Sequence, residues 1–464
     1  MTDSNRTIPT RLLDRIRSRV RTKLRHMGRL SRKSLRLALL LIGSALVALV
    51  SLGFARLADM ALAWNRRWTS EYGWLAFVAL PLGLLVLRWL TLRFAPYSGG
   101  SGIPQVMGAL SLPPGRAQWR LVSLQTVWKI PLSFAGMALG ASIGREGPSV
   151  QVGAAVMLAW SRLCQRLGVP LRDFDLRELI AAGAAGGLAA AFNAPLAGVM
   201  FAIEELGRGV SLRWQRHVLV AVLTAGFLVV AVAGNNPYFG HFNGETFAHG
   251  MLGWTLLCCL INGVLGGVFA RLLAGSLAEN LPRKLGTLVR RHPYWMAAGM
   301  GLALACLGTL TAGSVYGTGY DVAATLLAGK PAPVDGFGLA KLFATVASYW
   351  AGIPGGIFTP ALTTGAGIGA QIWHWLGSGV DQRVLVLLSM AAFLAAATQA
   401  PLTASVVVME MTGSQPMLFW LLAASLGASV VSKQFSPHPF YHLVAGRFRR
   451  QTLAAEAAFA AKPS

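Results

Sequence analysis

The segment GREGPSVQVGA, residues 144–154, places an arginine and a glutamate side by side between two glycines, inside an otherwise apolar part of the chain. Glycines suit the end of one segment and the start of the next. Pro148 suits the first turn of a new helix, where its missing N–H has no intrahelical partner to lose. The free N–H groups of Arg145, Glu146 and Gly147 would then point into the break. Because a helix N-terminus carries roughly half a positive charge, we expect this break to attract an anion.

Composition places the break in a lipid bilayer. Of the 464 residues, 54% are apolar and only 12% are charged, whereas soluble domains carry about 25% charged residues. Long apolar runs begin at Leu37, Gly73, Val218 and Trp420, and a helix needs roughly 20 apolar residues to cross a bilayer. Many other runs are shorter or broken by glycine and proline, which is tolerated at membrane depth only where protein or a cavity surrounds them. We therefore predict an all-α polytopic membrane protein with functional helix breaks.

The formal charge of +24 leaves two interpretations open, nucleic-acid binding and membrane topology. Much of the charge lies in the first 36 residues, and further basic clusters close the apolar segments. This pattern favours the positive-inside rule and contact with anionic lipid, because no basic domain interleaved with aromatic residues stands apart. We expect cytoplasmic termini, membrane lipid as a partner and no nucleic acid.

Chemistry other than transport has little support in the sequence. The four cysteines lie in or beside apolar segments without metal-ligand spacing, so neither disulfides nor a metal site is expected. An intramembrane hydrolase built on Glu204 and Glu205 is the enzymatic alternative. Adjacent helical residues point about 100° apart, a poor geometry for joint acid–base work. We therefore predict no enzyme, and no cofactor besides bound chloride ions.

The chain also repeats itself. LAAAFNAPLAGVMFAIEE from residue 188 resembles LAAATQAPLTASVVVMEM from residue 394, an offset of 206. GREGPSVQVGA matches GIFTPALTTGA from residue 356 at an offset of 212, and GSG at residue 100 pairs more weakly with GTG at residue 317. Three matches in one order at nearly one offset indicate two related halves. Such halves are typical of transporters, in which sites form where broken helices from both halves meet.

Two more glycine-opened helix starts accompany the first one. GGIFTP exposes the N–H groups of Ile357 and Phe358 before Pro360, and GGSGIP offers the hydroxyl of Ser101 before Pro104. Together the three starts could surround a dehydrated anion with partial charges, so that no fixed cation is needed. The alternative is that these are ordinary glycine and proline kinks for helix packing.

Few acids lie inside the apolar segments, and a carboxylate at membrane depth is a functional-site hypothesis by default. Glu146 could sit ionised in the anion's place, or take a proton and swing away. Glu205 could exchange protons with the cytoplasm, or be a helix-end residue paired with Arg208. Glu204 and Glu410 correspond by the repeat, and we expect both to bond nearby backbone or polar groups.

GGSGIP, GREGPSVQVG, AAAFNAPLAGVMFAIEE, GGIFTPAL and APLTASVVVMEMT occur in the order and at the spacing of the CLC chloride channel and transporter family, which the chain resembles from about residue 37 to 450. HPFYHLVAGR resembles the last helix of that family with its pore tyrosine. The resemblance implies a homodimer with one anion pathway per subunit, built from about 18 short tilted helices in two inverted repeats. It implies Glu146 as the gating glutamate. The predicted chloride-binding residues are Gly100, Ser101, Arg145, Gly147, Ile357, Phe358 and Tyr441.

The resemblance also bears on the subtype. Exchangers have a second, internal glutamate, which Glu205 matches, so proton-coupled chloride antiport in a bacterial inner membrane is favoured over a passive channel of the same fold. Ser101 matches chloride-preferring members, and Pro148 and Tyr441 argue against the fluoride-exporting branch. The expected divisions are a basic cytoplasmic arm (1–36), a transmembrane domain (37–450) with halves 37–234 and 251–433 and a last helix 437–450, and a short tail (451–464).

Overall fold

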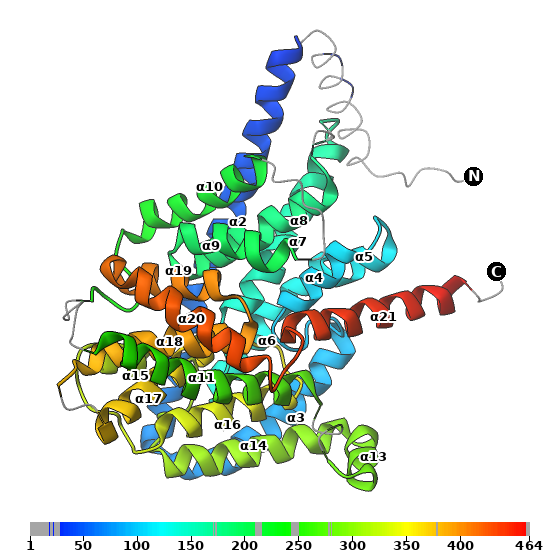
Figure 1. Ribbon diagram of the computed structural model, residues 1–464. Coiled ribbons are helices and arrows are strands. Elements are labelled where there is room, and N and C mark those ends of the chain that lie inside the picture. The colour runs from blue at the N-terminus through cyan, green and yellow to red at the C-terminus, as the bar shows by residue number, and fades with distance from the viewer. Residues whose placement is uncertain are drawn as a thin grey trace.

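A computed structural model describes residues 18, 22, 28–169, 171, 174–208, 216–242, 250–276, 279, 281–376 and 379–460. Regular structure within these residues is helical throughout, as the composition predicted (Figure 1). Most of the predicted arm, 1–36, lies outside the described residues.

The elements up to residue 233 alternate long helices with short, interrupted ones. They are α2 (Arg29–Glu71), η1 (Gly73–Leu75), α3 (Ala76–Phe94), α4 (Ile103–Ser111), α5 (Arg116–Leu121), η2 (Leu124–Trp128), α6 (Lys129–Leu139), α7 (Glu146–Arg166), α8 (Leu176–Phe192), α9 (Pro195–Phe201), the π-helical turn η3 (Ala202–Leu206) and α10 (Arg216–Ala233).

The same alternation continues after residue 250. These elements are α11 (Met251–Ala274), α13 (Arg283–Arg291), α14 (Pro293–Leu310), α15 (Tyr320–Leu327), α16 (Phe337–Trp350), α17 (Phe358–Leu376), α18 (Gln382–Thr398), α19 (Pro401–Thr412), η4 (Gln415–Met417), α20 (Leu418–Ser432) and α21 (Phe440–Ala460). Proline stands in the first turn of α4, α9, α14 and α19, where it starts a helix without losing a hydrogen bond.

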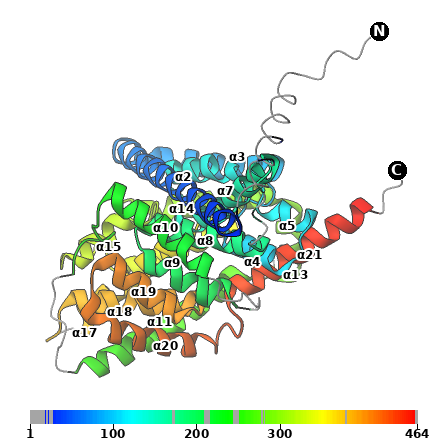
Figure 2. The same ribbon diagram turned by 90° about the horizontal axis from the view of Figure 1, so that it is seen from above.

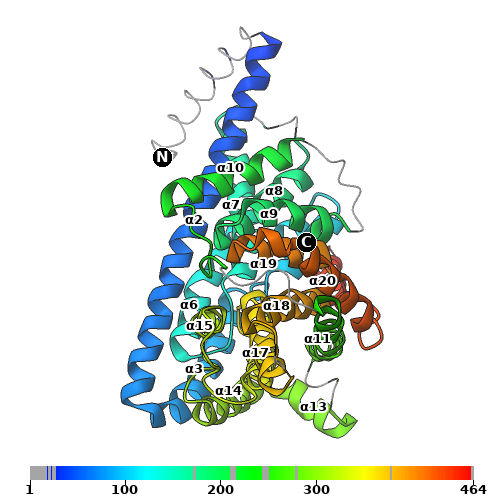
Figure 3. The same ribbon diagram turned by 60° about the vertical axis from the view of Figure 1, so that its left-hand side comes forward.

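Six helical stretches among the described residues are long and apolar enough to cross a membrane. The first of them belongs to α2, which has 43 residues and is therefore about 65 Å long. Since the hydrocarbon core is roughly 30 Å thick, α2 extends well beyond it, and Figure 3 shows it running past the rest of the bundle. This helix begins at Arg29, so the end of the predicted arm is already helical.

Two helices, α8 and α18, form the centre of the molecule. Every residue from Glu178 to Phe192 is buried, as is nearly all of α18, which fits their apolar surface on all sides. Glycines let one neighbouring helix pack closely against each of them, α7 against α8 and α17 against α18. A Cβ on Gly153 of α7 would overlap the carbonyl oxygen of Gly183, and one on Gly365 of α17 would overlap that of Ser389. Gly153 and Gly365 are 212 residues apart, so the repeat reproduces this close packing.

Glu204 and Glu410 each accept hydrogen bonds from the start of a helix in the opposite half of the chain. The carboxylate of Glu410 accepts the N–H groups of Leu196 (3.1 Å) and Ala197 (2.6 Å) at the start of α9. Glu204 accepts the N–H groups at the start of α19 from Leu402 (3.1 Å) and Thr403 (2.6 Å). Each acid therefore satisfies two of the donors that a helix N-terminus leaves free. The structural role predicted for both residues agrees with these contacts.

The last helix is longer than predicted. It runs from Phe440 to Ala460 rather than ending at residue 450, and it extends away from the bundle (Figure 2). The residues after Gln451 are mostly alanine, leucine and glutamate, which are strong helix formers. No glycine or proline interrupts them before Pro463.

Replacing Glu410 with alanine should lower stability, because two N–H groups at the start of α9 lose their acceptor, and that of Ala197 is partly buried. A lost cap of this kind costs about 1–2 kcal/mol. Thermal unfolding of the detergent-solubilised protein measures the loss. Glu279→Ala is the control, since it removes the same charge from an exposed carboxylate that pairs with Arg447 and, among the described residues, accepts only one exposed backbone N–H, that of Ser276. Equal unfolding temperatures for the two variants would contradict the assigned role.

Candidate anion site

Backbone hydrogen bonds join the three glycine-rich loops. Gly144 and Gly356 exchange two of them, each 2.7 Å long. Gly100 donates its N–H to the carbonyl of Ile353 (3.0 Å) and accepts from the N–H of Gly355 (3.1 Å). The starts of α4, α7 and α17 are thereby held together, and the predicted convergence of three helix N-termini is present in the structure.

Glycine is required in these loops by close approach and by backbone conformation. A Cβ on Gly147 would overlap the hydroxyl of Ser101 and lie 2.6 Å from its carbonyl oxygen. Gly100 and Gly102 have φ values of +71° and +109°, in the left-handed region that side chains other than hydrogen disfavour. The motif therefore brings the start of α7 directly against the Ser101 loop.

Two hydroxyl groups face the interior of this site. Ser101 and Tyr441 are 1% and 0% exposed, and neither hydroxyl oxygen has a hydrogen-bond partner among the described residues. A buried hydroxyl without a partner is unfavourable by about 1–3 kcal/mol. The two hydroxyls lie beside each other without meeting the distance and angle of a full hydrogen bond, and Glu146 and Glu205 lie within electrostatic range of the Tyr441 hydroxyl. The predicted serine, tyrosine and glutamates are therefore brought together, with donors available to an anion.

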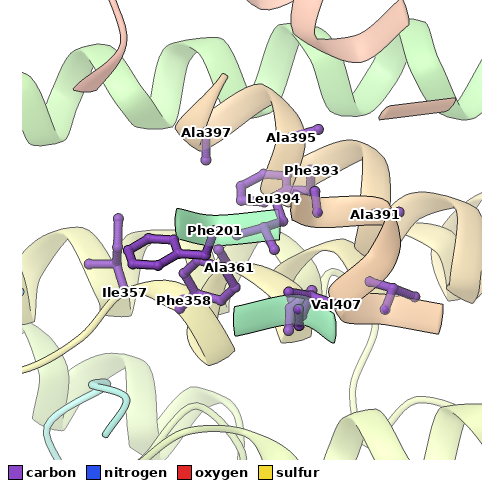
Figure 4. Close-up of a cluster of buried hydrophobic side chains, with 14 of the residues drawn as sticks. Phe201, Ile357, Phe358, Ala361, Ala391, Phe393, Leu394, Ala395, Ala397 and Val407 are labelled. Atoms are coloured by element: carbon purple, nitrogen blue, oxygen red, sulfur yellow. The ribbon is translucent and has the colours of Figure 1, made fainter. Parts of the chain in front are cut away.

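Ile357 and Phe358 are anchored by their side chains. Both are 2% exposed, and they gather against Phe201 in the apolar cluster (Figure 4). Phe358 begins α17, and the first N–H groups of a helix have no intrahelical partner. Burial of the side chains thus fixes the direction of the backbone donors.

The carboxylate of Glu146 lies where these helix starts meet. The side chain is fully buried, and one oxygen, Oε1, accepts a hydrogen bond from the Thr359 hydroxyl. The other, Oε2, has no hydrogen-bond partner in the part of the chain that the structure describes, and it lies so close to Gly144 that a Cβ there would overlap it. The backbone N–H groups of residues 146 and 359 also face the carboxylate. Sequence reasoning missed Thr359, although it lies within the quoted GGIFTP.

The guanidinium of Arg145 turns toward α2. Nη1 donates to the Ala55 carbonyl (2.7 Å) and to Asp59 (2.8 Å) on α2. The guanidinium carbon also lies 5.4 Å from the centre of the Tyr238 ring. Its positive charge is thus directed toward a different part of the molecule.

Glu205 lies in the π-helical turn after α9, a geometry that is common at functional sites. It is 1% exposed, and neither carboxylate oxygen has a hydrogen-bond partner in the described part of the chain. Arg208 lies 3.9 Å from Glu204 instead and donates to the carbonyl of Gln399 (2.7 Å). The alternative in which Glu205 pairs with Arg208 is therefore not the arrangement found.

A buried lysine, which sequence reasoning did not single out, stands behind the Ser101 loop. Lys129 is 0% exposed, and its Nζ donates to Gln151 Oε1 (2.7 Å). A Cβ on Gly102 would lie 3.0 Å from this ammonium. The structure thus adds a buried amino group behind the loop, bonded to Gln151, while the expectation that the anion needs no fixed cation stays a prediction. The signal available in the sequence was a lone lysine in the apolar stretch WKIPLSFAG.

Comparison with known proteins identifies the family to which the chain is similar. Residues 82–433 match the family described as voltage gated chloride channel. The H(+)/Cl(-) exchange transporter ClcA of Vibrio cholerae is 32% identical over 441 residues, which cover 87% of each chain. The protein of the same name in Cronobacter sakazakii is 32% identical over 397 residues, covering 80% of this chain and 79% of the relative.

The chain belongs to the CLC family. It is therefore an anion-transport protein of the membrane and not an enzyme.

Solved structures agree on the fold. A slow cyanobacterial Cl⁻/H⁺ antiporter superposes with a TM-score of 0.73 at 23% identity, covering 89% of this chain and 98% of the other. A CLC-type fluoride/proton antiporter superposes with a TM-score of 0.69 at 22% identity, covering 90% and 99%. The predicted CLC fold is confirmed by these similarities.

Thr359→Val should speed anion flux at neutral pH, because the Glu146 carboxylate loses a donor that holds it at the helix starts. A hydrogen bond to a charged group is worth about 2 kcal/mol, of which part is lost again when the carboxylate moves, so we expect roughly a tenfold rise. Chloride efflux from liposomes measures it. Thr364→Val is the matched control, since that hydroxyl bonds the carbonyl of Pro360. An unchanged rate in Thr359→Val would show that the bond does not retain Glu146.

Proposed function

We propose that this CLC protein exchanges chloride for protons across a bacterial inner membrane, as a homodimer with one pathway in each subunit. Chloride passes Ser101 and Tyr441 and competes with the carboxylate of Glu146 for the helix N-termini. Protons reach Glu146 from the cytoplasmic side through Glu205. The relatives named H(+)/Cl(-) exchange transporter support this assignment.

The observation that carries the proposal is the position of Glu146. A fully buried carboxylate with one unpartnered oxygen sits among the starts of α7 and α17, where the backbone favours a negative charge. Only one negative group can hold this place at a time. Protonation removes the charge of Glu146, so that chloride replaces it, and each exchange of the anion is tied to a proton.

The internal end of the proton route is Glu205. Its carboxylate is buried without a partner, and it lies within electrostatic range of Tyr441. An ionised carboxylate is unfavourable in such a place unless it is neutralised by a proton. These properties suit a group that takes up and releases protons, and no salt bridge from the described residues holds it ionised.

The orientation follows from the basic helix ends. The basic helix α13 and the C-terminal end of α21 lie on one side of the molecule, while α15 lies on the opposite side (Figure 1). By the positive-inside rule, we assign the first side to the cytoplasm, and the predicted cytoplasmic location of both termini is part of the same proposal. The mouth nearest α15 is then external. The repeat halves of this arrangement are residues 37–234 and 251–433.

Glu146→Gln should leave chloride flux running without proton movement, because glutamine has no charge to gate and no proton to carry. The test is proton uptake into liposomes driven by a chloride gradient, with chloride efflux recorded in parallel. Chloride flux without proton flux is the expected result. Continued proton uptake by Glu146→Gln would overturn the role of this residue.

Glu205→Gln should likewise abolish proton coupling while chloride still passes. The reversal potential in a combined chloride and pH gradient measures coupling: the unmodified protein should respond to both gradients, and the variant only to chloride. Glu178→Gln is the control, because Glu178 is also buried, 7% exposed, but lies at the start of α8. If the unmodified protein ignored the pH gradient, it would be a passive chloride channel.

A further inference from the structure

A cavity of about 280 Å³ lies on the α15 side of Glu146. We call it the mouth cavity; the residues on which its chemistry depends are Asp59, Arg66, Arg145, Tyr238, Tyr320 and Asp321. Arg66 and Asp321 also line an adjoining cavity of about 480 Å³. The mouth cavity therefore adjoins a second space, and the Arg66–Asp321 pair stands between the two.

Two arginine side chains line the mouth cavity, one buried (Arg145) and one exposed (Arg66). The Arg145 side chain is 8% exposed. Its Nη1 bonds Ala55 and Asp59, but its buried Nε has no hydrogen-bond partner within the described residues. Arg66 is 58% exposed. A buried guanidinium with an unused donor beside an exposed, movable one is suited to binding an anion.

The Asp321 carboxylate is bound to the guanidinium of Arg66 in this structure. The two side chains form an ion pair between α2 and the first turn of α15. They are 58% and 64% exposed, and exposed pairs contribute only about 0–1 kcal/mol. Anions from solution can therefore exchange with the Asp321 carboxylate. When Asp321 leaves, Arg66 and Arg145 face only one acid, Asp59, and the cavity becomes net positive.

Aromatic rings connect the mouth cavity to the anion site. The Tyr320 ring lies 4.8 Å from that of Tyr238, which lies 6.2 Å from Phe192, which in turn lies 5.3 Å from Phe358 (centroid distances). Phe358 opens α17 at the anion site. A continuous wall of rings thus runs from the mouth to the helix starts.

The repeat supplies a second reason to expect an anion here. Thr318, in the GTG loop before α15, corresponds to Ser101 in GSG, and it also lines the mouth cavity. The buried Lys341 donates to the carbonyls of Val315 (2.8 Å) and Gly317 (2.7 Å) in this loop. Lys341 and Lys129 are 212 residues apart, so each half places a buried lysine behind its glycine loop.

We propose that the mouth cavity is an anion-capture site, in which a monovalent anion such as a halide binds Arg66 and Arg145 by displacing the carboxylate of Asp321. The anion then passes along the ring wall to Glu146. This inference rests on anion transport, which the family establishes, and not on proton coupling.

Asp321→Asn should strengthen capture, because the competing carboxylate is gone, whereas Arg66→Gln should weaken it. An exposed ion pair of up to about 1 kcal/mol corresponds to a change of up to about fivefold in the half-saturating chloride concentration, downward for Asp321→Asn and upward for Arg66→Gln. The measurement is the exchange rate in liposomes, with chloride varied equally on both faces at constant ionic strength. Glu279→Gln is the control, since it removes one acidic charge from an exposed pair elsewhere.

If Asp321→Asn and Glu279→Gln shifted the half-saturating chloride concentration equally, the effect would come from net charge and the proposal would fail. An unchanged half-saturating concentration in Asp321→Asn would also overturn it. Bromide soaked into crystals of Asp321→Asn gives an independent readout. An anomalous peak beside Arg66 and Arg145 is expected in the mouth cavity, and its absence would count against capture. A peak beside Ser101 and Tyr441 reports separately on the anion site, so the two assignments can fail independently.

Discussion

The reciprocal hydrogen bonds between Gly144 and Gly356 are the constraint on which the site depends. They hold together the starts of α7 and α17, each of which carries a partial positive charge, and like charges repel. The arrangement is stable because a negative group sits between them. In the structure that group is the Glu146 carboxylate, bonded to Thr359. In the proposed mechanism a chloride ion uses the same backbone donors as the carboxylate, so the fold and anion transport depend on one set of N–H groups.

Much of the site could be predicted because its signals are local. Glycine before a helix and proline in its first turn mark a break in any sequence, and the repeat then shows that several breaks belong together. What could not be predicted depends on distant contacts. The guanidinium of Arg145 turns toward Asp59, 86 residues away, and Thr359 meets Glu146 across 213 residues. Lys129 was missed because a lone lysine gives no sign of what it faces until the helices are packed.

Carboxylates occupy anion positions at two depths of the proposed pathway, and burial sets how firmly each is held. Asp321 is 64% exposed, and water screens its attraction to Arg66. Glu146 is completely buried, where the same charge interacts several times more strongly with its surroundings. An anion arriving from solution therefore meets a weakly held competitor first and a strongly held one second. In the proposed exchange only the second carboxylate must take up a proton before it can leave, so the coupling step would lie at the buried site.

The repeat indicates which acids serve structure and which serve transport. Glu204 and Glu410 occupy equivalent positions in the repeat. Each accepts hydrogen bonds from the start of a helix in the other half, so both have the same structural role. Glu146 corresponds instead to Phe358 at the offset of 212, and Glu205 corresponds to Met411 at the offset of 206. At both positions one half has an acid where the other has an apolar side chain. The proposed exchange of anions and protons by different routes requires a departure from the twofold relation, and these two buried carboxylates are positions where the two halves differ.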